Sequence, residues 1–526
     1  MALHFRPSCA GNAASADALF RRVMVCAVWL FVAAALYLVP GCANPADTGT
    51  LEVAVIVPPS SASDPFQGVD FIRITISGVT IENPLVQTFA FANRSGAIRG
   101  VPFGSGRQVL LEGLVDSPDG LVVARGRTMP FEIHSGTIPK LNLFLNRVNS
   151  FAPTSSATNK TATMFFEDRV GAPIVELADG RILIAGGASL SSDGSIAKVT
   201  NTAVIFDPNT GDFSLLAAKL QFPRANHSAT LLDDGTVLIA GGVTLIDNQI
   251  DRVRPCERFD PNLERFVSSA TLTFGRAFHT ATKLPDGSVV LAGGVQPSSS
   301  STNYLSSVER YVPDNDAFQA LTDLSVPRSH HTVTVDPNDG QTLYLIGGQN
   351  ESGGLDSIQI YAAPMSGGSP SLGPTMKSPR VHHTATWLAD LQLVAIIGGF
   401  PNEQQLDAPL ADCEFFSVFE RKLVDAPLAT MNKPRGFHNA AAIDGKRILI
   451  YGGSIGSGLI GDAEILQAKS QSEIRLAVLQ SSKPVAPRAM GQILRLANGQ
   501  FLILGGVASR TSFQGERRGE LFTADN

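Results

Sequence analysis

Histidine is the residue type whose spacing in this chain first suggests chemistry. Five histidines each follow an arginine by three positions, and they are His227, His279, His331, His383 and His438. Clustered imidazoles can bind zinc, but such a site needs three or four donors about 2.0–2.3 Å from one ion. These histidines occupy equivalent positions of a sequence repeat that is described below. We therefore expect each to have the same structural role, such as hydrogen bonding to a neighbouring repeat. We therefore predict no metal ion and no cofactor.

Two further histidines, His330 and His382, directly precede members of that series. Neighbouring side chains of an extended segment point in opposite directions, so these two should face away from the structural set. They are the histidines that we assign as candidates for ligand binding.

The cysteines and the catalytic motifs give little chemistry. Beyond residue 42 the only cysteines are Cys256 and Cys413. They fall in one column of small apolar positions but in different repeats, and a disulfide needs Cα atoms within about 7 Å. We predict two buried small hydrophobes and no disulfide. No phosphate-binding loop and no Ser/His/Asp spacing is recognisable, so we assign no catalytic residue.

The elements that position these residues form a repeat. Gly-Gly pairs begin at residues 186, 241, 293, 347, 398, 452 and 505, and each ends a short apolar run. Asp-Gly or Asn-Gly precedes most of these runs, which predicts a tight hairpin. Two more strand-like runs follow each pair. Four strands per repeat of 51 to 55 residues predict a blade of a β-propeller, and seven pairs predict seven blades.

The Gly-Gly pair after an apolar strand, followed by two aromatic residues, resembles the kelch repeat. The resemblance covers residues 161–526 and implies a seven-bladed kelch-type β-propeller. The last repeat ends at its third strand, so we expect the strand-like segment Thr161–Phe166 to complete the last blade. Kelch propellers also bring galactose-oxidase-like copper chemistry to mind. That chemistry would need two tyrosine and two histidine ligands, one tyrosine being cross-linked to a cysteine, and the sequence assembles no such set.

The loops between the second and third strands of each repeat are long and differ in every repeat. Variable loops on a rigid scaffold are where binding specificity is usually built. With the two histidines above, the candidate ligand-binding residues are Asp247, Asp251, Arg252, Arg254, Tyr304, His330, Asn350, Glu351, His382, Asn402 and Glu403.

A different pattern precedes the repeats. Residues 51–148 contain six or seven short strand-like runs, such as Phe71–Ser77, with apolar residues on alternate positions. This pattern predicts a small β-sandwich. Residues 149–160 are rich in Ser, Thr, Asn and Ala, and we expect them to form a linker.

The first 41 residues have the pattern of a secretory signal peptide. Arg21 and Arg22 precede an apolar run that ends in a small residue, Gly41. The segment Leu38-Val39-Pro40-Gly41-Cys42 resembles the lipobox of bacterial lipoproteins, in which Cys42 would carry the lipid. Residues 42–50 would then be the tether. The resemblance implies a lipoprotein of the bacterial outer membrane, and the alternatives are a plain transmembrane anchor or an ordinary signal peptide.

Composition limits the partners. The net charge is −6 and no basic run is present, which argues against a nucleic-acid partner. We expect a binding or scaffold lipoprotein whose propeller loops bind a glycan or a protein. The alternative is an extracytoplasmic carbohydrate-active enzyme, such as a galactose-oxidase-like copper oxidase.

Overall fold

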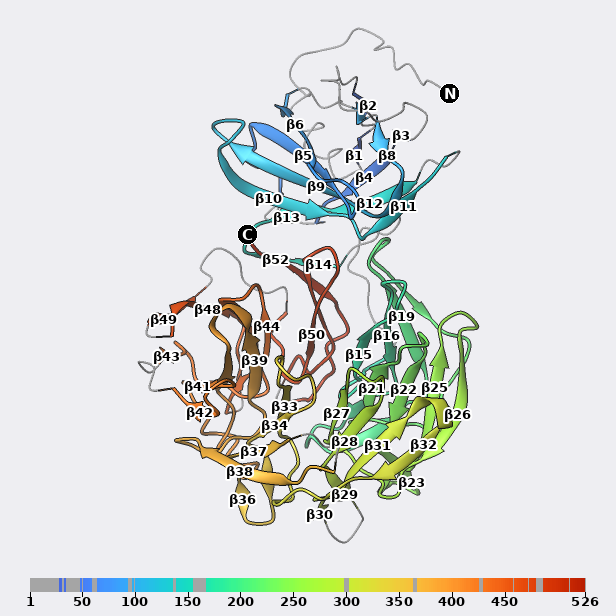
Figure 1. The fold of residues 1–526 in the computed structure, drawn as a ribbon, viewed down its shortest axis with the longest axis vertical. Coiled ribbons are helices and arrows are strands. Elements are labelled where there is room, and N and C mark those ends of the chain that lie inside the picture. The colour runs from blue at the N-terminus through green and yellow to red at the C-terminus, as the bar shows by residue number, and fades with distance from the viewer. Residues whose placement is uncertain are drawn as a thin grey trace.

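The computed structural model describes most of the chain as β-structure (Figure 1). The described residues are 28–30, 33–34, 48–49, 51–58, 64–92, 97–98, 100–135, 139–154, 167–297, 302–362, 367–424, 429–456, 458–471, 473–478, 486–509 and 511–525. Within these ranges the helical segments are the 3₁₀ turns Pro313–Asn315 and Ala389–Leu391. No helix in these ranges is long and apolar enough to cross a membrane. Cys42 and most of the predicted signal peptide lie outside them.

Seven antiparallel sheets in the described residues repeat one strand order, and we number them sheet 1 to sheet 7 along the chain. The first strands, which contact one another from sheet to sheet, are β15 (Ile174–Glu176), β21 (Ser228–Leu231), β27 (Thr280–Lys283), β33 (Thr332–Val335), β39 (Thr384–Leu388), β44 (Asn439–Ala442) and β50 (Gln492–Arg495). The second strands are the apolar runs before Gly-Gly, and they are β16 (Ile182–Ala185), β22 (Val237–Ala240), β28 (Val289–Ala292), β34 (Leu343–Ile346), β40 (Leu393–Ile397), β45 (Arg447–Tyr451) and β51 (Phe501–Leu504). Every residue of these runs except Arg447 is buried.

The outer two strands complete each sheet. The third strands are β19 (Ala203–Asp207), β25 (Pro255–Asp260), β31 (Val308–Val312), β37 (Ser357–Tyr361), β41 (Asp412–Ser417), β48 (Ala463–Ser470) and β52 (Glu520–Thr523). The fourth strands of sheets 1 to 6 are β20 (Asp212–Leu215), β26 (Arg265–Thr271), β32 (Ala317–Ala320), β38 (Pro370–Thr375), β42 (Lys422–Leu423) with β43 (Ala429–Thr430), and β49 (Glu473–Val478).

The fourth strand of sheet 7 comes from the segment of chain that precedes sheet 1. Strand β14 (Ser150–Pro153) pairs antiparallel with β52, so the two ends of the ring are joined in one sheet. Phe151 anchors it, with its ring centroid 4.8 Å from that of Phe522 and 5.3 Å from that of Tyr451. The prediction that residues 149–160 are only a linker is therefore wrong at its start. Thr161–Phe166, which we expected to close the ring, lie outside the described residues.

The Gly-Gly pairs connect neighbouring sheets. Both glycines of each pair have positive φ; in Gly241-Gly242 the values are 72° and 96°. The amide of Gly242 donates to the carbonyl of Arg276 in the next sheet at 2.8 Å. A Cβ on Gly241 would lie 2.4 Å from that same carbonyl oxygen. Only glycine satisfies both the backbone conformation and the close approach.

The arginine column holds the inner ends of the sheets. Arg276 is fully buried, and its Nη1 donates to the carbonyls of Gly293 and Ser307, both at 2.9 Å. Its Nη2 forms an ion pair with the buried Glu309 at 2.7 Å. The same pair recurs as Arg224–Glu257, Arg380–Glu414, Arg435–Glu464 and Arg488–Glu520.

The histidine column has the structural role that its recurrence predicted. Nε2 of His279 lies 3.0 Å from Oγ of Ser228, the first residue of the preceding sheet's inner strand. His331 repeats this contact with Thr280, His383 with Thr332 and His438 with Thr384. His227 has no such partner because Pro173 occupies the corresponding position.

The two cysteines occupy equivalent sites in different sheets. Cys256 lies on β25 and Cys413 on β41, and both are buried free thiols. Burial raises the pKa of the Cys256 thiol to about 12. Each packs as a small apolar side chain against its neighbouring sheet.

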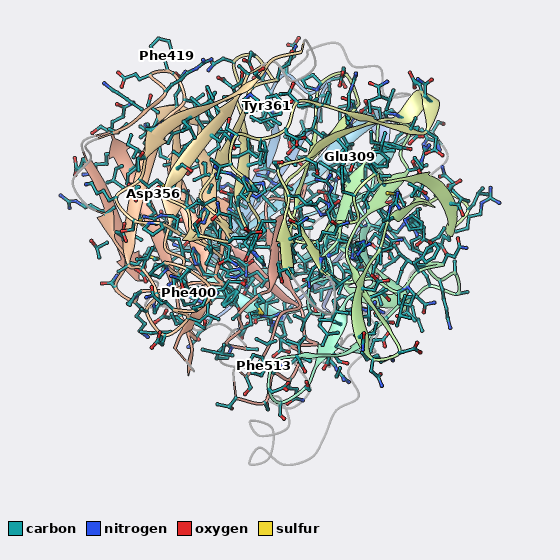
Figure 2. The ribbon with its side chains drawn as sticks, turned by 90° about the horizontal axis from the view of Figure 1, so that it is seen from below. Glu309, Asp356, Tyr361, Phe400, Phe419 and Phe513 are labelled. Atoms are coloured by element: carbon teal, nitrogen blue, oxygen red, sulfur yellow. The ribbon has the colours of Figure 1, made fainter. Side chains whose placement is uncertain are left out.

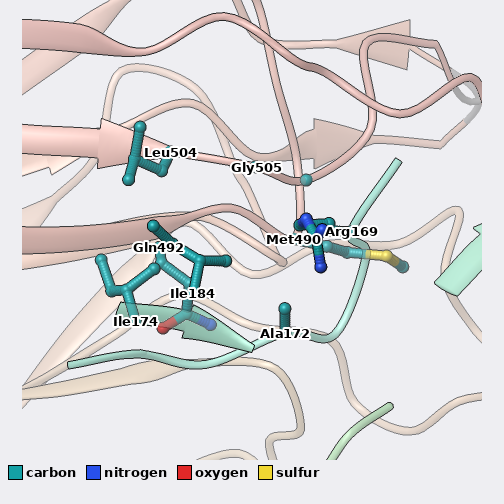
Figure 3. Close-up of a pocket in the computed structure, with 9 residues that line it drawn as sticks. Arg169, Ala172, Ile174, Ile184, Met490, Gln492, Leu504 and Gly505 are labelled. Atoms are coloured by element: carbon teal, nitrogen blue, oxygen red, sulfur yellow. The ribbon is translucent and has the colours of Figure 1, made fainter. Parts of the chain in front are cut away.

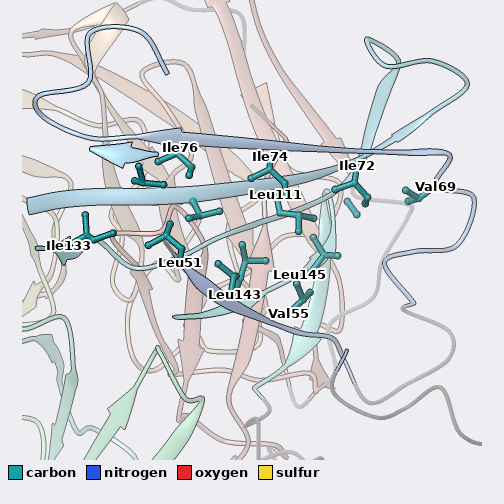
Figure 4. Packing of buried hydrophobic residues seen from close by; sticks show 14 residues of the cluster. Leu51, Val55, Val69, Ile72, Ile74, Ile76, Leu111, Ile133, Leu143 and Leu145 are labelled. Carbon is teal, nitrogen blue, oxygen red and sulfur yellow. The ribbon is translucent and has the colours of Figure 1, made fainter. Parts of the chain in front are cut away.

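The N-terminal region forms two facing sheets. One has the order β13 (Asn146–Arg147), β10 (Leu121–Arg127), β9 (Gly104–Val115), β5 (Phe71–Ser77), β6 (Leu85–Ala90), with β11 (Phe131–Ile133) on β9. The other has β1 (Val28–Leu30), β4 (Glu52–Ile56) and β12 (Lys140–Phe144). Residues of β5 alternate between buried and half-buried, as the sequence pattern predicted. Buried side chains from both sheets form one core (Figure 4).

This N-terminal region packs on the side of the ring that carries the hairpins between first and second strands. Gln108 Nε2 donates to the carbonyl of Ala497, and Gln500 Nε2 donates to the carbonyl of Phe144. The long hairpins between second and third strands lie on the other side, as β23, β29, β30 and β36 show at the bottom of Figure 1. They are β17–β18 (188–199), β23–β24 (243–252), β29–β30 (295–304), β35–β36 (349–354) and β46–β47 (454–459). We call this side the hairpin face.

Candidate functional site

A second column runs around the centre of the ring on the hairpin face, two residues after each arginine. Its members are Gly171, Asn226, Phe278, His330, His382, Phe437 and Met490, and all seven have positive φ, between 52° and 71°. Main-chain hydrogen bonds connect several neighbours, as from the amide of Phe437 to the carbonyl of His382 at 3.1 Å. The side chains of this central column differ from sheet to sheet, unlike those of the buried columns.

The positive φ values have a local cause. The residue after each arginine bridges to the residue after Gly-Gly, as in Ser329 with Gln349 and Val381 with Phe400. The chain must then turn at once into the first strand. A left-handed residue makes that turn, although it is unfavourable for any residue with a Cβ, and the surrounding hydrogen bonds hold it in place.

Two imidazoles and one carboxylate meet in this column. Glu403 Oε1 lies 3.1 Å from His382 Nε2 and 3.4 Å from His330 Nε2. The three donor atoms all lie within 4.8 Å of one another. The side chains of His330 and His382 are 9% and 15% exposed, and that of Glu403 is 37% exposed. The group is therefore reachable from solvent mainly at the carboxylate.

Aromatic rings hold the two imidazoles. The His330 ring lies 4.2 Å from that of Phe278, and the His382 ring lies 4.0 Å from that of Phe437. The two imidazoles meet edge to face at 4.6 Å. Phe400, which Figure 2 labels in a view onto the hairpin face, is buried and packs against Phe437 at 5.2 Å.

Polar contacts fix the outer atoms of the group. Ser329 Oγ lies 3.0 Å from Nδ1 of His330, which leaves only Nε2 of that ring directed at Glu403. The amide of Glu403 donates to Oε1 of Gln349, and Nε2 of Gln349 donates to the hydroxyl of Tyr304 at 3.0 Å. Sheets 3, 4 and 5 therefore all contribute to positioning the carboxylate.

The protonation states follow from burial and the neighbouring groups. Burial, with a contribution from His382, lowers the pKa of His330 to about 3, so its imidazole is neutral at pH 7. Burial tends to raise the pKa of Glu403, but the hydrogen bond from His382 and the nearby His330 outweigh it and bring the pKa to about 2. The carboxyl is ionised at pH 7.

The structure brings together three of the predicted ligand-binding residues, His330, His382 and Glu403, and links Tyr304 to them through Gln349. The other candidates lie elsewhere on the hairpin face. Asp247, Asp251, Arg252 and Arg254 are in or next to the β23–β24 hairpin of sheet 2. Asn350 and Asn402 accept amide hydrogen bonds within their own turns, and Glu351 is exposed.

Sequence reasoning missed Phe278, Phe437, Ser329 and Gln349. The signal for the first two was present, because the position two residues after each arginine can be aligned through all seven repeats. Gln349 also stands out, since the residue after Gly-Gly is Ala, Val or Phe in five other repeats and Ser in one.

A small pocket lies at the seam between sheets 7 and 1 (Figure 3). At other junctions a buried histidine of one sheet bonds to a hydroxyl of the preceding sheet. At this junction Ala172 occupies the histidine position and Gln492 the hydroxyl position, and both line the pocket. The imidazole that fills five of the other junctions is missing here. The pocket therefore follows from a break in the repeat.

The tyrosines do not supply a galactose-oxidase-like ligand set among the described residues. Tyr311, Tyr344, Tyr361 and Tyr451 are fully buried within the sheets. Tyr304 is bonded to Gln349, and neither Cys256 nor Cys413 lies beside it, since both are buried in sheets 2 and 5. The donor set present is two imidazoles and one carboxylate.

Comparison with known proteins identifies the fold. No protein-family model matches the chain, and no curated protein matches it by sequence. Among solved structures, that of YjhT aligns with a TM-score of 0.44 and 13% identity, over 60% of this chain and 98% of the other. A fungal alcohol oxidase of the AA5 family, in complex with copper, aligns with a TM-score of 0.53 and 15% identity, over 69% of this chain and 75% of the other. Together with the ring of sheets, the likeness to the alcohol oxidase shows a kelch-type β-propeller fold.

Proposed function

We propose that this protein is an extracytoplasmic binding lipoprotein whose seven-bladed kelch propeller binds a glycan on the hairpin face. The observation that carries the proposal is a cluster at the central column. Four column residues from sheets 3 to 6 gather there with Glu403 of sheet 5, and they are Phe278, His330, His382 and Phe437. Residue types that recur from sheet to sheet support the ring. The residue types at the central column change from sheet to sheet, and they lie on the face away from the N-terminal region.

The chemistry of the column suits a sugar. The C–H face of a pyranose is apolar and packs on aromatic rings, while its hydroxyls need hydrogen-bond acceptors and donors. Phe278 and Phe437 supply rings on either side of the imidazoles, and Glu403 supplies an ionised acceptor that is 37% exposed. A few placed polar groups among aromatic side chains are the usual composition of a small-molecule site.

The remainder of the chain serves attachment in this proposal. Residues 1–41 direct export, Cys42 carries the lipid, and residues 42–50 are a tether to the outer membrane. Residues 51–148 form a β-sandwich that separates the propeller from the membrane and leaves the hairpin face free. Metabolic labelling with a fatty acid tests this part: the wild type incorporates label and Cys42→Ser does not.

Glycan-array binding of full-length protein in detergent tests the binding role. We expect the wild type to bind at least one glycan of the array. Phe278→Ala and Phe437→Ala should each weaken that binding by about 10-fold or more, because each removes an aromatic ring on which the sugar packs. Phe419→Ala is the matched control, since Phe419 is 79% exposed, in the β41–β42 turn. Equal losses in all three variants, or no retained glycan, would contradict the proposal.

A second candidate is a copper-dependent oxidase acting on the alcohol groups of carbohydrates. The fold shared with an alcohol oxidase solved in complex with copper favours it, as does the presence of two imidazoles near the propeller axis. The positions of the tyrosines weigh against a galactose-oxidase-like centre. Oxygen consumption by copper-loaded protein with galactose and simple primary alcohols tests this candidate.

A further inference from the structure

We propose that His330, His382 and Glu403 bind one divalent transition-metal ion, zinc or copper, at the centre of the hairpin face. The ligand atoms would be Nε2 of each histidine and a carboxylate oxygen of Glu403. This ion site goes beyond the binding role proposed above and does not depend on it. Only its use in recognising a glycan rests on that function.

The spacing of the donor atoms suits a tetrahedral ion. Metal–nitrogen and metal–oxygen bonds of about 2.0–2.2 Å place tetrahedral ligand atoms about 3.3–3.6 Å apart. Glu403 Oε1 is 3.4 Å from His330 Nε2 and 3.1 Å from His382 Nε2, and all three donors lie within 4.8 Å of one another. Small side-chain rotations would suffice to place the ion.

The site is also held in shape before an ion arrives. The two imidazoles are clamped between Phe278 and Phe437, and their backbones occupy a constrained left-handed turn. Ser329 Oγ sits on Nδ1 of His330, which is the outer hydrogen bond that orients a metal-binding imidazole and fixes its tautomer. Gln349 holds the main chain of Glu403.

The donor set selects the class of ion. Imidazole nitrogens suit zinc and copper, and zinc also accepts a carboxylate oxygen, whereas calcium and magnesium prefer sites made of oxygen alone. Three protein ligands leave a fourth position open, and the carboxylate side of the group is the exposed one. A hydroxyl or carboxylate oxygen of a bound glycan would take that position.

The neighbouring buried histidines show why this pair is different. His331 and His383 follow His330 and His382 directly in sequence, yet their Nε2 atoms bond to Thr280 and Thr332. Both are buried, with 5% of each residue exposed, and their Nε2 atoms are directed at these hydroxyls. Position in the repeat thus assigns His331 and His383 to structure and His330 and His382 to the ion.

Metal titration of untagged full-length protein tests the proposal. The protein is stripped with a chelator and titrated by calorimetry with zinc, copper and calcium separately, without any glycan. We expect one equivalent of zinc or copper to bind and calcium not to bind. His382→Ala and Glu403→Gln should weaken the binding at least about 100-fold, since each removes a direct ligand. His134→Ala, an exposed histidine of the N-terminal region, should bind as the wild type does.

A spectroscopic measurement keeps the test independent of stability. Copper-loaded wild type should show hyperfine coupling from two imidazole nitrogens by electron paramagnetic resonance, and His330→Ala should show one. Glu403→Gln conserves size and should keep the wild-type melting temperature without metal. Absence of a stoichiometric ion, or affinity unchanged in His382→Ala and Glu403→Gln, overturns the ion site. Glycan binding measured with and without metal reports separately on the proposed function.

Discussion

The buried arginine and histidine columns and the central column differ in what repetition does to them. The arginine is present in all seven sheets, and the histidine three residues later is present in five. The residue between them, two after the arginine, changes in nearly every sheet while its left-handed backbone stays the same. One short segment therefore carries both the part of the repeat that must not vary and the part that is free to vary.

The difference has a physical cause. The arginine bonds to carbonyls and an acid of its own sheet, and the histidine bonds to a hydroxyl of the preceding sheet, so a change in either column leaves a buried partner unsatisfied. Side chains of the central column pack on one another, as His330 does on Phe278, and none of them belongs to the Arg–Glu or His–hydroxyl pairs that hold the ring. Such positions can accept a phenylalanine, an imidazole or a glycine without loss of the ring. New chemistry in this fold should therefore be sought in the central column.

The largest effect should come from breaking a buried ion pair. Arg276→Met leaves Glu309 buried without its cation, and we expect a loss of about 3–5 kcal/mol in the free energy of unfolding. Arg328→Met is the matched control, because the acid of that sheet is replaced by Gln359 while the carbonyl contacts of Arg328 are similar. Denaturant unfolding measures both, and equal losses would refute the role of the acid.

The buried histidine column should make stability depend on pH. Burial, with the adjacent arginine, lowers the pKa of His279 and of His438 to about 3, from about 6.5 in an unfolded chain. The unfolded state therefore binds more protons between these values, so stability falls as the pH falls from about 6.5 towards 3 and is level above. Each such histidine contributes up to about 1.4 kcal/mol per pH unit.

A single substitution isolates this contribution. The measurement uses protein freed of metal ions by a chelator. His438→Gln should reduce the slope of the unfolding free energy against pH, between pH 4.5 and 6.5, by the contribution of about one proton. Carboxylates with lowered pKa values act mainly below this window. His134→Gln, in an exposed position, should leave the slope as in the wild type. A slope unchanged in His438→Gln would show that this column does not control the acid response.

Much of the strand pattern could be predicted because it depends on local periodicity. The alternation over Phe71–Ser77 matches strand β5 residue for residue. The Gly-Gly spacing predicted every second strand, since a short apolar run bounded by glycine has few other solutions. Sheet 5 lacks the Asp-Gly signal, and its first two strands are joined through the 3₁₀ segment Ala389–Leu391 and a left-handed Gln392.

The closing strand was harder to predict because its partner is distant. Ser150–Pro153 contains one large apolar residue, Phe151, in a polar stretch, and its pairing with β52 spans more than 360 residues. Composition therefore indicated a linker. Only the packing of Phe151 against Phe522 and Tyr451 reveals the strand.

The candidate site was predictable in part for a related reason. His330 and His382 were singled out because they break the repeat, but their direction comes from a left-handed turn and not from strand alternation. Glu403 was one of many loop residues in the sequence. Its meeting with the two imidazoles depends on how the loop of sheet 5 returns over the axis, which no local pattern records.

The smallest expected effect comes from restoring the Arg–Glu ion pair in the one sheet that has a glutamine in place of the glutamate. Sheet 4 has Gln359 where five other sheets have glutamate, and both amide atoms of Gln359 lack a hydrogen-bond partner. Arg328 is fully buried there, and that burial lowers its pKa to about 10. Gln359→Glu should supply the missing anion and raise the free energy of unfolding by about 1–2 kcal/mol, because a charge-assisted hydrogen bond replaces an unpaired amide. Thermal unfolding of Gln359→Glu beside Gln359→Met measures it. If the methionine variant gains as much, relief of the unpaired amide explains the gain and the ion pair does not.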